Sequence, residues 1–222
     1  HYFGNRGSKR QDVLGTMLLS VLCGHWRYAH INSVRGDGVN PGLLGMTKTV
    51  SEDVVRETLK RMDETAALGW LAEQNRQAIG PILFLPWILD IDNTVKVLYG
   101  RQEGAQIGYN AHKPGRPSHN YHSYFVANVR LCLGVDVLPG REHAASHGLP
   151  GMWRMLEGLP RTHWPPFIRG DCAYGNEVIL TQCESRGVPY LFKLRHTPNV
   201  KALVRTSQRS GSGWQAVGDG WE

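Results

Sequence analysis

Apolar residues recur with helical spacing through the first 80 positions, so this part of the chain is predicted to be helical. A Gly-rich stretch over residues 33–48 interrupts the pattern. Ser51 then has the character of an N-cap, and Glu52 and Asp53 favour the positive end of a helix. The first helix, over about residues 11–28, is indicated by five apolar side chains three or four positions apart: Leu14, Met17, Leu18, Val21 and Leu22. We expect two or three helices in this region.

Beyond Gly80 the pattern changes to short apolar runs that are typical of strands. The predicted order is a strand, a strand pair, a helix, a strand, a helix and a strand, over residues 81–92, 121–140, 148–159, 165–171, 175–187 and 189–195. This order predicts an α/β layer with a mixed sheet. The Gly/Ser-rich segment 205–222 is predicted to be a loop.

Length and composition fit a soluble globular protein with one substantial core, or one core and a small appended domain. The 222 residues are 41% hydrophobic and 20% charged. No stretch is long and apolar enough to span a bilayer, so no membrane partner is expected. Four scattered cysteines argue against a disulfide scaffold and a zinc ribbon, and favour a reducing cytoplasm. The first residue is His1 and not Met, so we interpret the chain as an internal or trimmed fragment.

Positive charge is concentrated in the second part of the chain. The net charge is +6 overall. Residues 1–90 carry 10 basic and 9 acidic residues, whereas residues 91–222 carry 15 and 10. Residues 193–209 contain five basic residues and no acid. A surface of this kind suits a polyanion such as nucleic acid, and an ordinary solvated surface is the other interpretation.

Three acids follow apolar strand-like runs. Asp90 and Asp92 are separated by one residue and therefore share one face of a strand, and Asp171 closes the run "PPFIRGD". If the two strands are neighbours, Asp92 and Asp171 could both reach one Mg²⁺ or Mn²⁺, hard cations that prefer oxygen ligands. The alternative is that these acids are turn residues at strand ends.

The segments "LDIDNTVKVLYGRQEGAQIGYNAHKPGRPSH" and "IRGDCAYGNEVILTQCESRGVPYLFKLR", in this order, resemble the DDE transposases of bacterial insertion sequences. The resemblance is to the cut-and-paste branch with a β-strand insertion before the third acid. It implies an RNase H-like core in which the first acid stands in an Asp-x-Thr setting, matched by Asp92, and the second ends the fourth strand, matched by Asp171. Both residues would be catalytic metal ligands. Asp90 has no assigned role, but it would take the place of Asp92 if the match to the family motif is shifted by two residues.

The third acid of that family, a Glu within a Tyr/Arg/Glu/Lys signature on a helix, has no counterpart here. Glu177 and Glu184 come too early in the order of the fold, and no helix is predicted around Glu222. We therefore interpret the chain as truncated before the third acid and incomplete as a catalyst on its own. The expected regions are a helical, DNA-binding part over 1–80, the first part of the core over 81–205, and the start of an insertion over 206–222.

The resemblance further implies Mg²⁺- or Mn²⁺-dependent strand cleavage and strand transfer at transposon ends. The implied partner is double-stranded DNA, as transposon ends and target, bound by a homodimer and located with the bacterial nucleoid in the cytoplasm. Two alternatives stay open. One is a DNA-binding remnant, or inhibitory partner, that holds transposon ends without cutting them. The other is a metal-dependent nuclease of the same fold.

Candidate DNA contacts lie in two basic segments. The first, "GYNAHKPGRPSHNYHSY", offers Lys113 and Arg116 for phosphates and Tyr109 for stacking on a base. In the second, Lys193 and Arg195 share a face of the last strand. Without DNA contact, the first segment would be an ordinary basic hairpin loop and the second a charged edge of the sheet. Zinc binding by His119 and His122 is disfavoured because no cysteine or third histidine has a suitable spacing. A nucleophilic role for Cys172 is disfavoured because the sequence identifies no histidine base for it.

Overall fold

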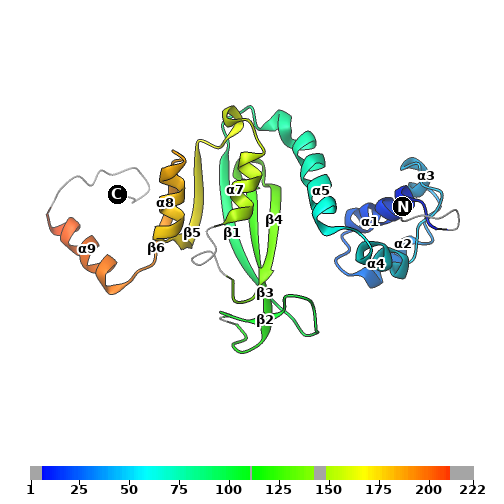
Figure 1. The fold of residues 1–222 in the computed structure, drawn as a ribbon, viewed down its shortest axis with the longest axis horizontal. Helices are drawn as coiled ribbons and strands as arrows, with labels where there is room; N and C mark the ends of the chain where they lie inside the picture. The colour runs from blue at the N-terminus through cyan, green and yellow to red at the C-terminus, as the bar shows by residue number, and fades with distance from the viewer. Residues whose placement is uncertain (1–6, 111, 143–148, 211–222) are drawn as a thin grey trace. The chain divides into compact units, whose positions relative to one another are not determined.

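The computed structural model describes residues 7–110, 112–142 and 149–210. The chain forms two compact units, His1–Leu71 and Ala72–Glu222, and each is described by itself (Figure 1). In the described residues no helix is both long and apolar enough to cross a membrane.

The first unit is helical, as the spacing of apolar residues predicts. Helix α1 ends at Leu22, earlier than the expected residue 28, because Gly24 adopts a φ of 73° that takes the chain out of the helix. Ser51 caps the next long helix by accepting a hydrogen bond from the Val54 amide. The helices are α1 (Arg10–Leu22), α2 (Ile31–Val34), α3 (Asn40–Leu43), α4 (Glu52–Lys60) and α5 (Glu64–Ile79), whose last turns belong to the second unit.

A buried carboxylate ties the first helix to the loop that precedes α4. Asp12 accepts hydrogen bonds from the amide and the hydroxyl of Thr47, both at 2.7 Å. Burial raises the pKa of Asp12, but these hydrogen bonds, a longer one from the Lys48 amide and the charge of Lys9 outweigh burial and hold the pKa below its usual value. The unit therefore contains a hydrogen-bonded carboxylate beside its small apolar core of Val13, Ile31, Val50 and Val55.

The second unit is built on a mixed sheet with the order β2-β3-β1-β5-β6, and β4 also pairs with β3. The β1–β3 and β3–β4 pairs are antiparallel, whereas β5 runs parallel to β1 and β6 parallel to β5. The strands are β1 (Ile88–Val97), β2 (Gln106–Ile107), β3 (Pro117–Val126), β4 (Leu131–Pro139), β5 (Phe167–Gly175) and β6 (Tyr190–Leu194). An antiparallel meander continued by two parallel strands is the RNase H-like arrangement, so the predicted fold class is confirmed.

The bounds predicted for the first strand are wrong at both ends. Residues 80–82 form a 3₁₀ turn, and β1 begins only after Pro86, which has no amide to donate to a ladder. The strand then continues five residues past Asp92 because β3 pairs with it as far as Val97. Asp92 therefore lies inside a strand and does not close one.

Helices α7 (Pro150–Glu157) and α8 (Glu177–Ser185) cover one face of the sheet. Their buried residues join a core with Leu89 and Ile91 of β1 and Ile168 of β5. The indole nitrogen of Trp153 donates to Gln182 at 2.6 Å and links the two helices. Alternation along β1 therefore gives the sheet a packed face, which carries Leu89 and Ile91, and an acid face, which carries Asp90 and Asp92.

The expected loop after residue 205 is partly helical. Thr197 caps α9 (Pro198–Arg209) by accepting from the Val200 amide, and Pro198 occupies its first turn. Residues 205–209 complete this helix, whereas 211–222 lie outside the described residues.

A buried hydroxyl joins the sheet to α7. Tyr124 of β3 donates to the carboxylate of Asp136 on β4 at 2.5 Å and accepts from the amide of Met152 in α7. Burial, followed by the adjacent carboxylate, raises the pKa of this phenol. The contact thus holds two strands and one helix at a single atom.

Tyr124→Phe is expected to destabilise the second unit, because it leaves a buried amide and a carboxylate oxygen without their partner, at a cost of about 1–3 kcal/mol for each unsatisfied group. Tyr190→Phe is the matched control, since its hydroxyl donates to Glu184 at the surface. Urea unfolding followed by tryptophan fluorescence measures both. Equal midpoints for the two variants would contradict a stabilising role for the Tyr124 hydroxyl.

Candidate metal-binding active site

The two acids singled out by the sequence occupy neighbouring positions on neighbouring strands. The parallel ladder between β1 and β5 pairs Asp90 with Arg169 and Ile91 with Gly170, and it ends there. The next residues on the two strands are Asp92 and Asp171. Paired strands lie about 4.8 Å apart, and Asp92 and Asp171 stand one position past the last pair, on the face of the sheet that also carries Asp90 and Arg169. Both side chains are exposed.

A buried tyrosine, Tyr174, lies three residues beyond Asp171 on β5. Its side chain is fully buried, and its hydroxyl has no hydrogen-bond partner in the described part of the chain. Burial raises the pKa of Tyr174, and the negative charges of both Asp92 and Asp171 raise it further. One buried hydroxyl therefore lies within electrostatic reach of both carboxylates.

Gly170 makes room for this arrangement. A β-carbon at this position would stand 2.8 Å from the Tyr174 ring and 2.9 Å from the side chain of Ile91. The glycine lets the tyrosine ring pack against the sheet directly beneath the acids. The sequence segment "IRGDCAYG" therefore combines a ligand, a spacer and a packing residue within a few positions.

Asp90 has a different environment from Asp92, although the two share a face. Arg169 donates to both oxygens of Asp90, from Nε at 3.0 Å and from a terminal nitrogen at 2.8 Å. Hydrogen bonding to Asp90 and its charge raise the pKa of Arg169. Within the described ranges neither Asp92 nor Asp171 has an ion-pair partner, although Oδ1 of Asp171 accepts a hydrogen bond from the Ala173 amide at 2.9 Å.

The pair fits a hard divalent cation as two of its ligands. Carboxylate oxygens suit Mg²⁺ and Mn²⁺, which keep several waters when the protein supplies one or two acids. The orphaned Tyr174 hydroxyl nearby is a polar group that such an ordered water could satisfy. Among the described residues, however, no group of three or more His, Cys, Asp or Glu side chains is placed to hold a metal.

The acids considered for a third position do not join this pair. Glu177 and Glu184 lie on α8, which packs on the opposite face of the sheet from Asp92 and Asp171. Glu184 accepts a hydrogen bond from Tyr190 at 2.9 Å. Glu222 lies outside the described residues.

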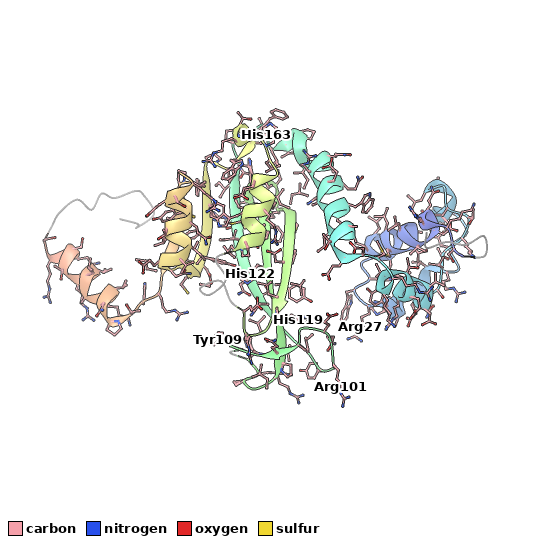
Figure 2. All side chains as sticks on the ribbon, viewed as in Figure 1. Arg27, Arg101, Tyr109, His119, His122 and His163 are labelled. Atoms are coloured by element: carbon pink, nitrogen blue, oxygen red, sulfur yellow. The ribbon has the colours of Figure 1, made fainter. Side chains whose placement is uncertain are left out.

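The predicted basic loop gathers around a residue that sequence reasoning missed. Lys113 and Arg116 place their charges 4.9 Å and 5.5 Å from the ring centre of Tyr99, and Lys113 also donates to its hydroxyl. This hydrogen bond, with the charges of the two basic residues, lowers the pKa of Tyr99. Tyr99 is 69% exposed and Tyr109 77% exposed, so both rings face solvent. Figure 2 shows Tyr109 and Arg101 at the end of the sheet where β2 lies.

Lys193 and Arg195 are both exposed, at the end of β6 and just beyond it. In the adjoining helix α9, basic residues recur every fourth position and therefore form one line along the helix: Lys201, Arg205 and Arg209. All three are exposed. The line spans about 12 Å of the helix axis.

The structure gives no support for a zinc site at His119 and His122 or for a nucleophilic Cys172. His119 and His122 point to opposite faces of β3, because their spacing of three is odd in a strand. His119 bonds the Glu103 carbonyl at 2.8 Å, and His122 is buried edge-on to Tyr174. Cys172 is an exposed free thiol beside Asp171.

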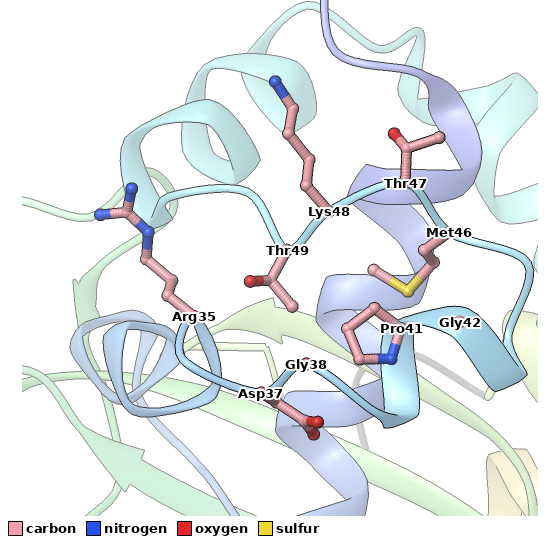
Figure 3. A pocket seen from close by; sticks show the side chains of 9 residues that line it. All are labelled: Arg35, Asp37, Gly38, Pro41, Gly42, Met46, Thr47, Lys48 and Thr49. Carbon is pink, nitrogen blue, oxygen red and sulfur yellow. The ribbon is translucent and has the colours of Figure 1, made fainter.

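The first unit contains a pocket of about 390 Å³ (Figure 3). Arg35 and Lys48 extend from its rim, and in the described part of the chain neither forms an ion pair. Asp37, the acid in the lining, accepts from the Val39 and Asn40 amides and from the Asn40 side chain. The pocket contains none of the acids discussed above.

Comparison with known proteins identifies the family. The family model described as "Transposase DDE domain group 1" matches residues 9–217. The chain therefore belongs to the DDE-domain transposase family, as the resemblance of the two acid-bearing segments indicates. No curated protein matches the sequence.

Solved structures with a similar arrangement include transposases bound to DNA. A piggyBac transposase synaptic complex with hairpin DNA is 13% identical, with a TM-score of 0.44, over 90% of this chain and 45% of that one. A Mos1 transposase paired-end complex with the left transposon end is 11% identical, with a TM-score of 0.32, over 99% of this chain and 70% of that one. The chain thus spans less than half of the piggyBac transposase.

If Asp92 and Asp171 hold one cation, calorimetric titration with Mn²⁺ should show binding that the Asp92→Ala/Asp171→Ala double variant weakens by about tenfold or more, that is by at least about 1.4 kcal/mol. Glu177→Gln is the matched control, an exposed acid on the other face of the sheet, and should bind as the parent does. Undiminished binding by the double variant would show that the two strands do not form a metal site.

Proposed function

We propose that this chain is the DNA-cleaving part of a DNA transposase that uses Mg²⁺ or Mn²⁺ for strand cleavage and strand transfer at transposon ends. The observation that carries the proposal is the adjacent placement of Asp92 and Asp171 where the β1–β5 ladder ends. Family membership supplies the reaction class, and the two carboxylates would supply the metal ligands.

In this proposal the residues of the chain hold and position, and the bound metal supplies an activated oxygen nucleophile and charge neutralisation at phosphorus. Asp92 and Asp171 hold the metal on a sheet whose other face is packed, so their backbone positions are fixed before DNA binds. Gly170 and Tyr174 maintain the packing beneath them. Such positioning is the main contribution a protein makes to phosphoryl transfer.

Double-stranded DNA is the proposed partner, as transposon end and as target. Phosphates would contact Lys113, Arg116, Lys193 and Arg195, and Tyr109 would stack on an unpaired base. The basic line on α9 extends this surface. The helical first unit, with Arg35 and Lys48 at its pocket, is the proposed additional DNA-binding region, and a homodimer is the proposed assembly on DNA.

A second candidate function is DNA binding without cleavage, as a remnant or inhibitory partner of a complete transposase. The observation that favours it is the lack of a third carboxylate beside Asp92 and Asp171 among the described residues. The two candidates share the DNA surface and differ only in cleavage.

Nicking of supercoiled plasmid DNA in the presence of Mn²⁺ separates them. An active chain should lose nicking in Asp92→Ala and in Asp171→Ala while binding DNA nearly as the parent does, whereas Asp90→Ala should be much milder. Parent protein that binds but does not nick would favour the non-cleaving candidate. Loss of binding with intact nicking in either variant would refute the assigned roles.

The DNA surface is tested by the salt dependence of binding. Each of Lys113→Gln, Arg116→Gln, Lys193→Gln and Arg195→Gln should lower the slope of log K against log salt by about 0.9 for each phosphate contact removed. Arg154→Gln, an exposed charge on α7, is the control and should leave the slope unchanged. Slopes that do not distinguish these variants from the control would place the DNA elsewhere.

A further inference from the structure

The acid face of the sheet carries three carboxylates within a short distance. Asp90 and Asp92 are two residues apart on one strand, about 6.6 Å along it, and Asp171 is beside Asp92 on the next strand. Asp92 could therefore share a cation either with Asp171 or with Asp90, since Mg²⁺ and Mn²⁺ accept any such oxygen. A single metal position requires that the alternative pair, Asp90 with Asp92, be blocked.

Arg169 is placed to withhold Asp90. It stands opposite Asp90 in the parallel ladder, two residues before Asp171, and so projects from the same face as the acids. Its planar guanidinium engages both oxygens of Asp90, at 3.0 Å and 2.8 Å, in the geometry that best matches a carboxylate.

The side chains of Arg169 and Asp90 are 46% and 39% exposed, so the pair faces solvent and its two-point geometry contributes at most modestly to folding stability. Their position, immediately beside the two unpaired acids, is what distinguishes the pair from the helical surface pairs of the first unit, such as Lys60 with Glu57.

We propose that Arg169 is a positioning residue that keeps Asp90 out of the metal site and thereby confines the cation to Asp92 and Asp171. The inference rests on the proposed function in that it concerns the same metal site. It assigns to Arg169 a role that requires no contact with the metal or with DNA.

Mn²⁺ titration of Arg169→Gln tests this role by the sign of the effect. Removing the guanidinium frees Asp90 to share a cation with Asp92, so Mn²⁺ should bind roughly tenfold tighter, or at an additional site, than in the parent. In Arg169→Gln/Asp90→Asn the freed ligand is absent and the net charge equals that of the parent. This double variant should therefore return to the parent affinity within about twofold.

Two further variants separate ligand release from general electrostatics. Lys96→Gln removes one positive charge from the same face of β1 without freeing a carboxylate, and should change the affinity by no more than about twofold. Arg169→Lys retains the charge and should stay close to the parent. Equal gains in Arg169→Gln and Lys96→Gln, or an undiminished gain in the double variant, would overturn the proposal.

Mn²⁺ binding by the parent protein separates a failure of this proposal from a failure of the proposed function. If the parent does not bind Mn²⁺ and Arg169→Gln does, the two-acid site fails, and a gain that Asp90→Asn abolishes still shows that Arg169 blocks Asp90 as a ligand. If the parent binds and Arg169→Gln binds no better, the two-acid site stands and the role of Arg169 is refuted. If neither binds, both are refuted.

Discussion

The second unit depends on one constraint, the alternation of side chains along β1 at the centre of the sheet. Leu89 and Ile91 point into the core under α7 and α8, and the same backbone therefore turns Asp90 and Asp92 to the other face. A register slip of one residue would bury both acids and expose the core. The packing that stabilises the sheet thus also determines where the acids stand.

Pairing of β1 with β5 brings the acids of the two strands to neighbouring positions. A parallel ladder brings Arg169 opposite Asp90, and it ends one pair later, so that Asp92 and Asp171 are adjacent but no longer joined by the ladder. Because β1 is still held by β3 beyond this point, the acid on β1 stays in place while β5 departs. The site lies where β1 is no longer paired with β5 but is still paired with β3.

Much of this could be predicted from local sequence. Helical spacing predicted a helical first unit but missed the short helices α2 and α3, whereas Ser51 was recognised as a cap and the succession of apolar runs predicted the mixed sheet. The role of Arg169 could not be found this way, since it depends on the register between strands 79 positions apart. The bounds of β1 failed for the same reason, because Val97 is in a strand only through pairing with β3. The packing role of Tyr174 likewise depends on the shape of the folded sheet.

If the proposed metal site is correct, Gly170 is a second position, besides the two acids, at which a mutation would damage it. Any missense change there adds at least a β-carbon within 3 Å of Ile91 and Tyr174, so even alanine must displace the floor beneath the acids. A copy of the gene can therefore keep both aspartates and still have lost the geometry that makes them useful. Surveys that score copies as intact by their acids alone would count such copies as active, whereas the neighbouring glycine would reveal the damage.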